Sequence, residues 1–171
     1  MACRAYTNLS VLYCMFDSAR AIDVCLKGLE LARKIGDLGF QSRLNANLAG
    51  AYCNFTGECE DEGIAPAQQA IKLDRQLGLH DHLPVPLIVL GQIYQCHGDA
   101  ALALDCYQEA LKVAEDIGEP QLLFPCYDGL ATLYVEAGDF ERARTYLQQG
   151  ERVCEEAGLD VDSLIVLPFL C

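Results

Sequence analysis

Apolar residues recur every three to four positions along most of this chain, which is the spacing of one face of an α-helix. The pattern itself repeats about every forty residues. In each repeat an amphipathic stretch is followed by a polar turn and a second amphipathic stretch. We therefore predict pairs of helices. The first helices should cover residues 5–14, 41–54, 84–97 and 121–137, and the second helices residues 18–35, 64–77, 100–117 and 140–157.

Two landmarks keep their place in every repeat. A glycine ends each second helix, where its freedom to adopt a positive φ favours it as a cap. Each first helix carries a leucine followed four positions later by tyrosine, so that both side chains share one face. Aspartate in the turn within a pair, as at Asp99 and Asp139, is expected to cap the following helix. The landmarks are Gly36, Gly78, Gly118 and Gly158, and the pairs Leu9–Tyr13, Leu48–Tyr52, Leu90–Tyr94 and Leu130–Tyr134.

The third repeat carries the fullest form of a recognisable pattern, with Leu90, Gly91 and Tyr94 in its first helix and Ala103, Tyr107 and Ala110 in its second. This pattern resembles the tetratricopeptide repeat family. The repeat length is similar to the long-repeat subgroup of bacterial signalling and transcription regulators, kinesin light chains and spindle-orienting polarity adaptors. The resemblance implies a single all-α domain, a right-handed superhelical α-solenoid of about four helix–turn–helix repeats. The expected repeats are approximately 3–38, 39–80, 81–120 and 121–160, with a partial fifth helix at 161–171.

The resemblance also implies a protein- or peptide-binding scaffold whose first helices line a concave face. In the long-repeat relatives an asparagine on this face holds the backbone of an extended peptide. Asn8 and Asn47 occupy that position, although they could instead bond their own helices or water. Arg4 and Arg43 are equivalent to each other and either grip a ligand carboxylate or remain solvated or paired with nearby acids. The predicted concave-face residues are Arg4, Thr7, Asn8, Val11, Arg43, Asn47, Asn54, Gln92, Gln95, Asp128 and Thr132.

The net charge of −13 argues against direct binding of nucleic acid, because phosphate contacts need a basic surface. The acidic second half is either a solvated face or a surface for a basic partner. No apolar run is long enough to span a bilayer, and the first residues do not read as a signal peptide. We therefore expect a cytoplasmic protein that binds a protein or peptide, with no membrane and no nucleic acid among its partners.

The residues that carry chemistry do not form a catalytic or metal motif. Ten cysteines are present, but no CxxC pair occurs, and most lie within the helical patterns, where cysteine packs as a small apolar residue. His80 and His82 lie in a predicted loop without the further ligands that a metal site needs. Familiar nucleophile, phosphate-binding and dinucleotide motifs are missing. We expect neither enzymatic activity nor a cofactor.

The apolar ending, residues 163–171, aligns with the start of a fifth first helix. Repeat arrays normally bury such a face on a further unit. The chain is therefore either a piece of a larger regulator or a unit that docks on another copy. The alternative function is accordingly a structural homo-oligomerisation module of a larger signalling protein, such as the regulatory repeats of a bacterial cyclase or transcription regulator.

Overall fold

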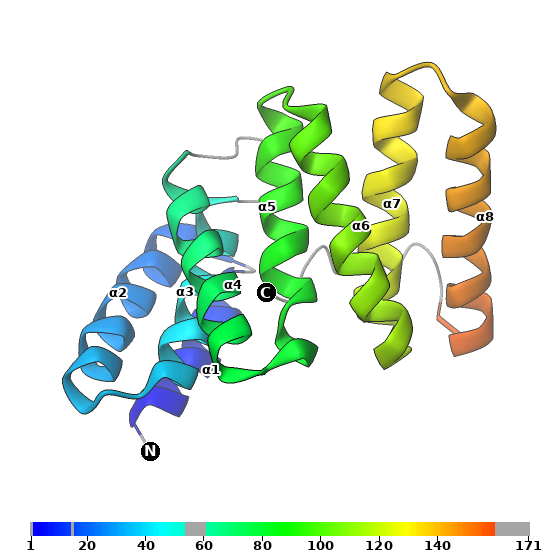
Figure 1. The fold of residues 1–171 in the computed structure, drawn as a ribbon. Helices are drawn as coiled ribbons and strands as arrows, with labels where there is room; N and C mark the ends of the chain where they lie inside the picture. Colours follow the sequence, from blue (N-terminus) through cyan, green and yellow to red (C-terminus); the bar gives the residue numbers. More distant parts are fainter. Residues whose placement is uncertain (1, 15, 54–60, 160–171) are drawn as a thin grey trace.

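The structure is a computed structural model that describes residues 2–14, 16–53 and 61–159. All regular structure in these ranges is helical, and the helices form four successive pairs (Figure 1). We name the pairs units 1 to 4, and the first and second helix of each unit its inner and outer helix. The elements are α1 (Ala2–Cys14), α2 (Ser18–Ile35), α3 (Leu38–Tyr52), η1 (Asp61–Gly63), α4 (Ile64–Leu77), η2 (His80–His82), α5 (Pro84–Cys96), α6 (Ala100–Ile117), α7 (Pro120–Glu136) and α8 (Phe140–Ala157).

The fold class and most helix bounds agree with the prediction. The four outer helices begin and end at the predicted residues. The inner helices differ by a few residues, chiefly because α1 begins at Ala2 and α3 at Leu38, each three residues earlier than predicted. Asp37 explains the earlier start of α3, since its side chain accepts the backbone N–H of Phe40 and caps the helix there. Asn54 and the expected partial helix at 161–171 lie outside the described residues.

Glycine ends every outer helix in the left-handed conformation that the sequence predicts. Gly36, Gly78, Gly118 and Gly158 have φ values of 72°, 68°, 76° and 65°. Their backbone N–H groups donate to carbonyl groups of the last helical turn, so the helix stops and the chain turns back.

Aspartate caps the outer helices unevenly. Asp139 Oδ1 accepts the backbone N–H of Arg142 at 3.2 Å, as predicted, and Asp17 does the same for Arg20 at 3.1 Å. The prediction for Asp99 is wrong, because its side chain makes no such bond at the start of α6. The helix α6 therefore begins without a side-chain cap.

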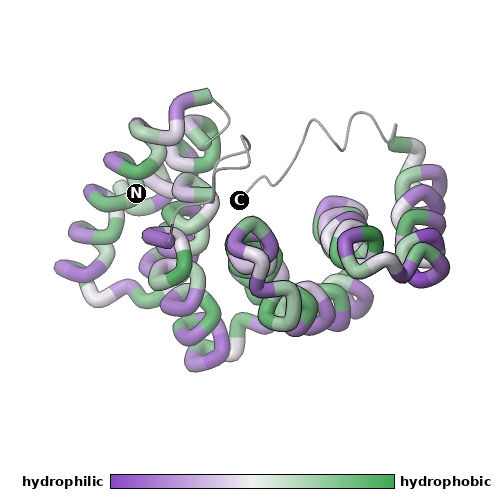
Figure 2. Tube along the Cα trace, turned by 90° about the horizontal axis from the view of Figure 1, so that it is seen from above, coloured by the Kyte–Doolittle hydropathy of each residue, from purple (hydrophilic) through white to green (hydrophobic). Residues whose placement is uncertain are grey.

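The helix pairs stack in sequence order along a curve (Figure 2). Each inner helix packs against its own outer helix and against the next inner helix, so that α1, α3, α5 and α7 form a continuous wall. Each of α2, α4 and α6 packs against the inner helix of the following unit. Comparison of the two views places α5 and α7 nearer the inside of the curve than α6. The described residues thus form an all-α solenoid of helix pairs.

Small residues allow neighbouring helices to pack closely together. The ring of Tyr107 is buried between α5 and α7, where a Cβ added at Gly91 would lie 3.0 Å and one added at Gly129 only 2.5 Å from ring atoms. At the first junction, a Cβ at Gly28 of α2 would lie 2.8 Å from Tyr6 and 3.0 Å from Leu44. Packing at this density leaves no room for a methyl group at these glycines.

The cysteines serve mainly as packing residues, as predicted. Of the eight that the structure describes, seven are buried and Cys96 is exposed. Burial raises the pKa of Cys25 and of Cys126 to about 12. Cys59 and Cys171 lie outside the described residues. No helix in the described ranges has both the length and the apolar character needed to cross a membrane.

Candidate binding surface on the inner helices

The predicted residues of α1 lie open or partly open on the inner wall. Arg4 and Asn8 are exposed, and Thr7 and Val11 are half-buried. The hydroxyl of Thr7 donates to the backbone carbonyl of Cys3 at 3.1 Å, a bond within the helix. Arg4 and Asn8 lie one helical turn apart, so they lie on the same face of α1. They are the polar groups of unit 1 that a ligand can reach.

The two equivalent asparagines have different environments. Asn47 is buried, and its amide donates to Ser10 Oγ at 2.8 Å and to the carbonyl of Thr7 at 3.4 Å. Asn47 therefore ties α3 to α1, whereas Asn8 is exposed. Arg43, the equivalent of Arg4, is also exposed. The structure thus places the two arginines and one of the two asparagines at the surface.

The middle of the inner wall, formed by α5, is apolar and largely buried. Most of α5 is buried, and Gln92 and Gln95 are half-buried. The Tyr107 hydroxyl donates to Gln95 Oε1 at 3.0 Å, and Gln95 Nε2 donates to Glu136 Oε1 at 3.4 Å. Gln95 therefore links α5 to α6 and α7. Its amide is already engaged, so it offers a ligand less than Gln92 does.

The inner helix α7 presents an acidic polar face. Asp128, Thr132 and Glu136 follow one another at intervals of four and are all exposed, with Val135 beside them. Desolvation raises the pKa of the Asp128 carboxyl above its usual value although the side chain is exposed. Protein atoms therefore surround this carboxylate without covering it, which is the environment expected on the inside of a curved wall.

Charge is distributed unevenly along the array. Residues 1–53 hold six Lys and Arg and four Asp and Glu, whereas residues 61–159 hold six Lys and Arg and seventeen Asp and Glu. The wall accordingly runs from Arg4 and Arg43 at one end to Asp128 and Glu136 at the other. Opposite charges at the two ends favour a ligand that carries both signs.

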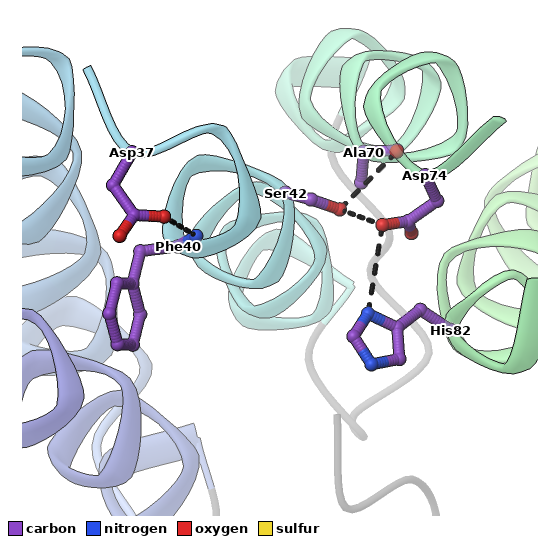
Figure 3. Close-up of polar contacts among 6 residues, drawn as sticks. All are labelled: Asp37, Phe40, Ser42, Ala70, Asp74 and His82. Atoms are coloured by element: carbon purple, nitrogen blue, oxygen red, sulfur yellow. Dashed lines mark hydrogen bonds and ion pairs between the residues drawn. The ribbon is translucent and has the colours of Figure 1, made fainter. Parts of the chain in front are cut away.

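A second polar cluster, which the sequence reasoning missed, lies between units 2 and 3 (Figure 3). The carboxyl group of Asp74 on α4 is buried. Its Oδ1 accepts the Ser42 hydroxyl of α3 at 2.5 Å and lies 3.8 Å from Nδ1 of His82. The Ser42 hydroxyl also lies 3.4 Å from the carbonyl of Ala70. Burial raises the pKa of Asp74, while Ser42, His82 and the charge of Arg43 oppose the rise.

The position of Asp74 within its repeat indicates this polar cluster. Asp74 lies four residues before Gly78, and at that position before their terminal glycines the other units carry Ala32, Ala114 and Cys154. A carboxyl group at an otherwise apolar position calls for buried polar partners. The cluster is not a nucleophile and base pair, because Ser42 donates to Asp74 and not to His82. Among residues that the structure describes, no group of three or more metal-ligating side chains converges.

The comparisons with known proteins agree with this architecture. Residues 85–156, which span most of units 3 and 4, match the sequence model of the tetratricopeptide repeat family. The comparison with curated proteins gave no match. The match covers the units in which the leucine–glycine–tyrosine and alanine–aromatic pattern is fullest. Membership of the long-repeat subgroup stays a prediction.

Proposed function

We propose that this chain, whose residues 85–156 match the sequence model of the tetratricopeptide repeat family, is a binding module for an extended peptide segment. Repeats of that family generally mediate protein–protein interaction. The segment lies along the inner helices. Its acidic part contacts Arg4 and Arg43, and its basic part contacts Asp128 and Glu136. Thr132 and Asn8 supply hydrogen bonds at the two ends.

The observation that carries this proposal is the environment of α7. Asp128 is exposed but desolvated, and its neighbours Thr132 and Glu136 are exposed on the same face. A carboxylate in such a setting gains more from a cationic partner than one on a convex surface, because surrounding protein lowers the local dielectric. A lysine or arginine of the ligand therefore binds more tightly at Asp128 than at the other exposed acidic residues.

The opposite end of the wall has complementary chemistry. A guanidinium group donates two parallel hydrogen bonds to a carboxylate, so Arg4 and Arg43 suit glutamate or aspartate side chains. The carboxamide of Asn8 offers one donor and one acceptor, which matches a single peptide unit. Asn47 takes no part in the proposed site, because its amide is bonded to α1.

Synthetic peptides of equal length test the proposal. One probe carries a glutamate run and a lysine run, and two others carry only one of these runs. Fluorescence anisotropy should show tighter binding of the mixed probe. Arg43→Ala should weaken the glutamate-containing probes about tenfold, and Asp128→Asn the lysine-containing probes by a similar factor.

Matched variants on outer helices separate this site from general electrostatics. Arg33→Ala on α2 and Asp116→Asn on α6 remove the same charges from exposed positions away from the inner wall. Their affinities should stay within about twofold of the parent, because exposed charges at a distance are screened by salt. Equal losses in the inner and outer variants would show that the inner wall is not the binding surface.

We further propose that the module acts in the cytoplasm as a regulatory element of a signalling pathway. Six buried cysteines of the described residues are free thiols, which fits a reducing compartment; they are Cys3, Cys14, Cys25, Cys106, Cys126 and Cys154. Self-association is the second candidate function, because leucine side chains at both ends of the array are about half exposed.

A further inference from the structure

The first inner helix exposes positions that are buried in the other three units. Leu9 is 42% exposed and Leu12 is 51% exposed. The equivalents of Leu9 are Leu48, Leu90 and Leu130, and those of Leu12 are Ala51, Ile93 and Leu133. All six are buried.

The junction between units 1 and 2 shows what covers these positions. Leu48 belongs to one apolar cluster with Cys25 and Leu29 of α2, and Ala51 to another with Cys14 and Ala21. The preceding unit therefore buries both positions on α3. The corresponding face of α1, which we call the head face, is Leu9, Leu12 and the exposed Asn8. Asn8 fits this picture because its equivalent, Asn47, bonds to the preceding inner helix.

The last outer helix exposes the matching half of the same contact. Leu147 on α8 is 47% exposed, whereas its equivalents Cys25, Ala67 and Tyr107 are buried. At the junction between units 3 and 4, Tyr107 packs against Gly129 of the next inner helix. In the same register, Leu147 meets Asn8 and its neighbour Leu9 of a following unit. Leu147 and the exposed Glu151, one turn later, form what we call the tail face.

We propose that the head face of one copy docks on the tail face of a second copy, so that two arrays continue as one solenoid. The described residues make this kind of contact three times, and the head and tail faces match the two halves of the same contact. The tail face carries Glu151 where α2 carries the buried Leu29, so the docked contact includes a negative charge. The basic unit 1, with exposed Arg4 and Arg20, provides the complementary charge.

This geometry is heterologous, because the two copies use different surfaces. Such contacts do not close in a dimer and add copies one after another as concentration rises. The docked contact shares Asn8 of α1 with the proposed peptide site on the inner wall. It extends that wall from one copy into the next and brings the acidic α7 of one copy beside the basic α1 of another.

Sedimentation velocity over a concentration series tests the proposal with three leucine-to-glutamate variants. Leu12→Glu blocks the head face and Leu147→Glu the tail face, and each should raise the dissociation constant for self-association at least about tenfold because a carboxylate enters an apolar contact. Leu26→Glu is the matched control. Leu26 is 50% exposed, and its equivalents Gln68, Gln108 and Gln148 are exposed in every other unit. The Leu26→Glu variant should self-associate like the parent.

Mixing the two blocked variants distinguishes this arrangement from other dimers. Leu12→Glu retains a free tail and Leu147→Glu a free head, so the mixture should form one heterodimer that does not grow further. Raised salt should weaken the parent's association by screening the charged part of the contact. Circular dichroism confirms that each variant is folded. A parent chain that stays monomeric at high concentration, or a Leu147→Glu variant that associates like the parent, would overturn the proposal.

Discussion

The packing of Tyr107 between α5 and α7 allows a sharp prediction for Gly129→Ala. A methyl group at position 129 would lie 2.5 Å from Cζ and 2.6 Å from Cε1 of the tyrosine ring. The ring cannot move away freely, because a Cβ added at Gly91 on α5 would lie only 3.0 Å from its Cε1 and the side chain is almost fully buried. The added methyl group must therefore push α7 away from unit 3.

The expected loss of stability follows from two opposing effects. Overpacking of a tight core typically costs about 1–3 kcal/mol. Alanine is a better helix former than glycine by about 1 kcal/mol, which offsets part of this cost. We expect a net decrease of about 1–2 kcal/mol in the free energy of unfolding. For a chain of this length the melting temperature should fall by about 3–6 °C.

Urea and thermal unfolding of a small set of variants provide the assay. Gly39→Ala is the control, because a methyl group there meets nothing closer than Asp37 Oδ1 at 3.5 Å. It should raise stability by about 0.5 kcal/mol through reduced freedom of the unfolded chain. Tyr107→Leu combined with Gly129→Ala should lose at least about 1 kcal/mol less than the sum of the single variants. A Gly129→Ala variant as stable as Gly39→Ala, or strict additivity of the pair, would refute the reasoning.

Three further tests probe features of single residues. Burial raises the pKa of Asp74, so the folded chain holds the carboxyl proton more tightly than the unfolded chain. Protonation of Asp74 therefore stabilises the fold below the usual pKa of 3.8, and this stabilisation is lost as pH rises through the folded pKa. Asp74→Asn should therefore be about 1–2 kcal/mol more stable than the parent at neutral pH. Urea titrations should show this difference in the free energy of unfolding shrinking toward acid pH. Parallel pH profiles of the two free energies would contradict the prediction. Cys126→Ser should leave the number of fast-reacting thiols in a native-state labelling assay unchanged, because burial raises the pKa of Cys126 to about 12 and only the thiolate reacts. Loss of a fast-reacting thiol in this variant would show that burial does not govern reactivity. Asp139→Ala should lower the free energy of unfolding by about 1 kcal/mol because it removes the cap of α8. Asp99→Ala should lower it clearly less, because Asp99 accepts no helical N–H. Equal losses of stability on thermal unfolding would argue against the cap.

The sequence predicted the helices well because each signal was local. The four terminal glycines, such as Gly118, end their helices at the expected residue, since a positive φ is a property of a single position. Apolar periodicity likewise located the helix faces. The start of α3 was missed because Asp37 caps it outside the apolar pattern. Caps depend on the rotamer of one side chain, which periodicity does not report.

The candidate surface was harder to predict because it depends on contacts between units. Asn8 and Asn47 occupy the same repeat position, but Asn47 bonds to the inner helix of the preceding unit, whereas Asn8 is exposed in the part of the chain that the structure describes. Sequence equivalence therefore did not give equal exposure. The Asp74 cluster required three elements, α3, α4 and η2, to meet. Its one local signal, a carboxyl group at an apolar register position, indicated that partners exist without saying which.

Hydrogen–deuterium exchange with and without the mixed-charge peptide tests the central claim most directly. The account predicts slower exchange on bound peptide at the exposed inner positions of α1 and α7, near Asn8 and Asp128, and unchanged exchange on α2, α6 and the outer face of α8. Protection confined to the outer helices, with α1 and α7 exchanging as in the free chain, would contradict the claim that the inner wall holds the ligand.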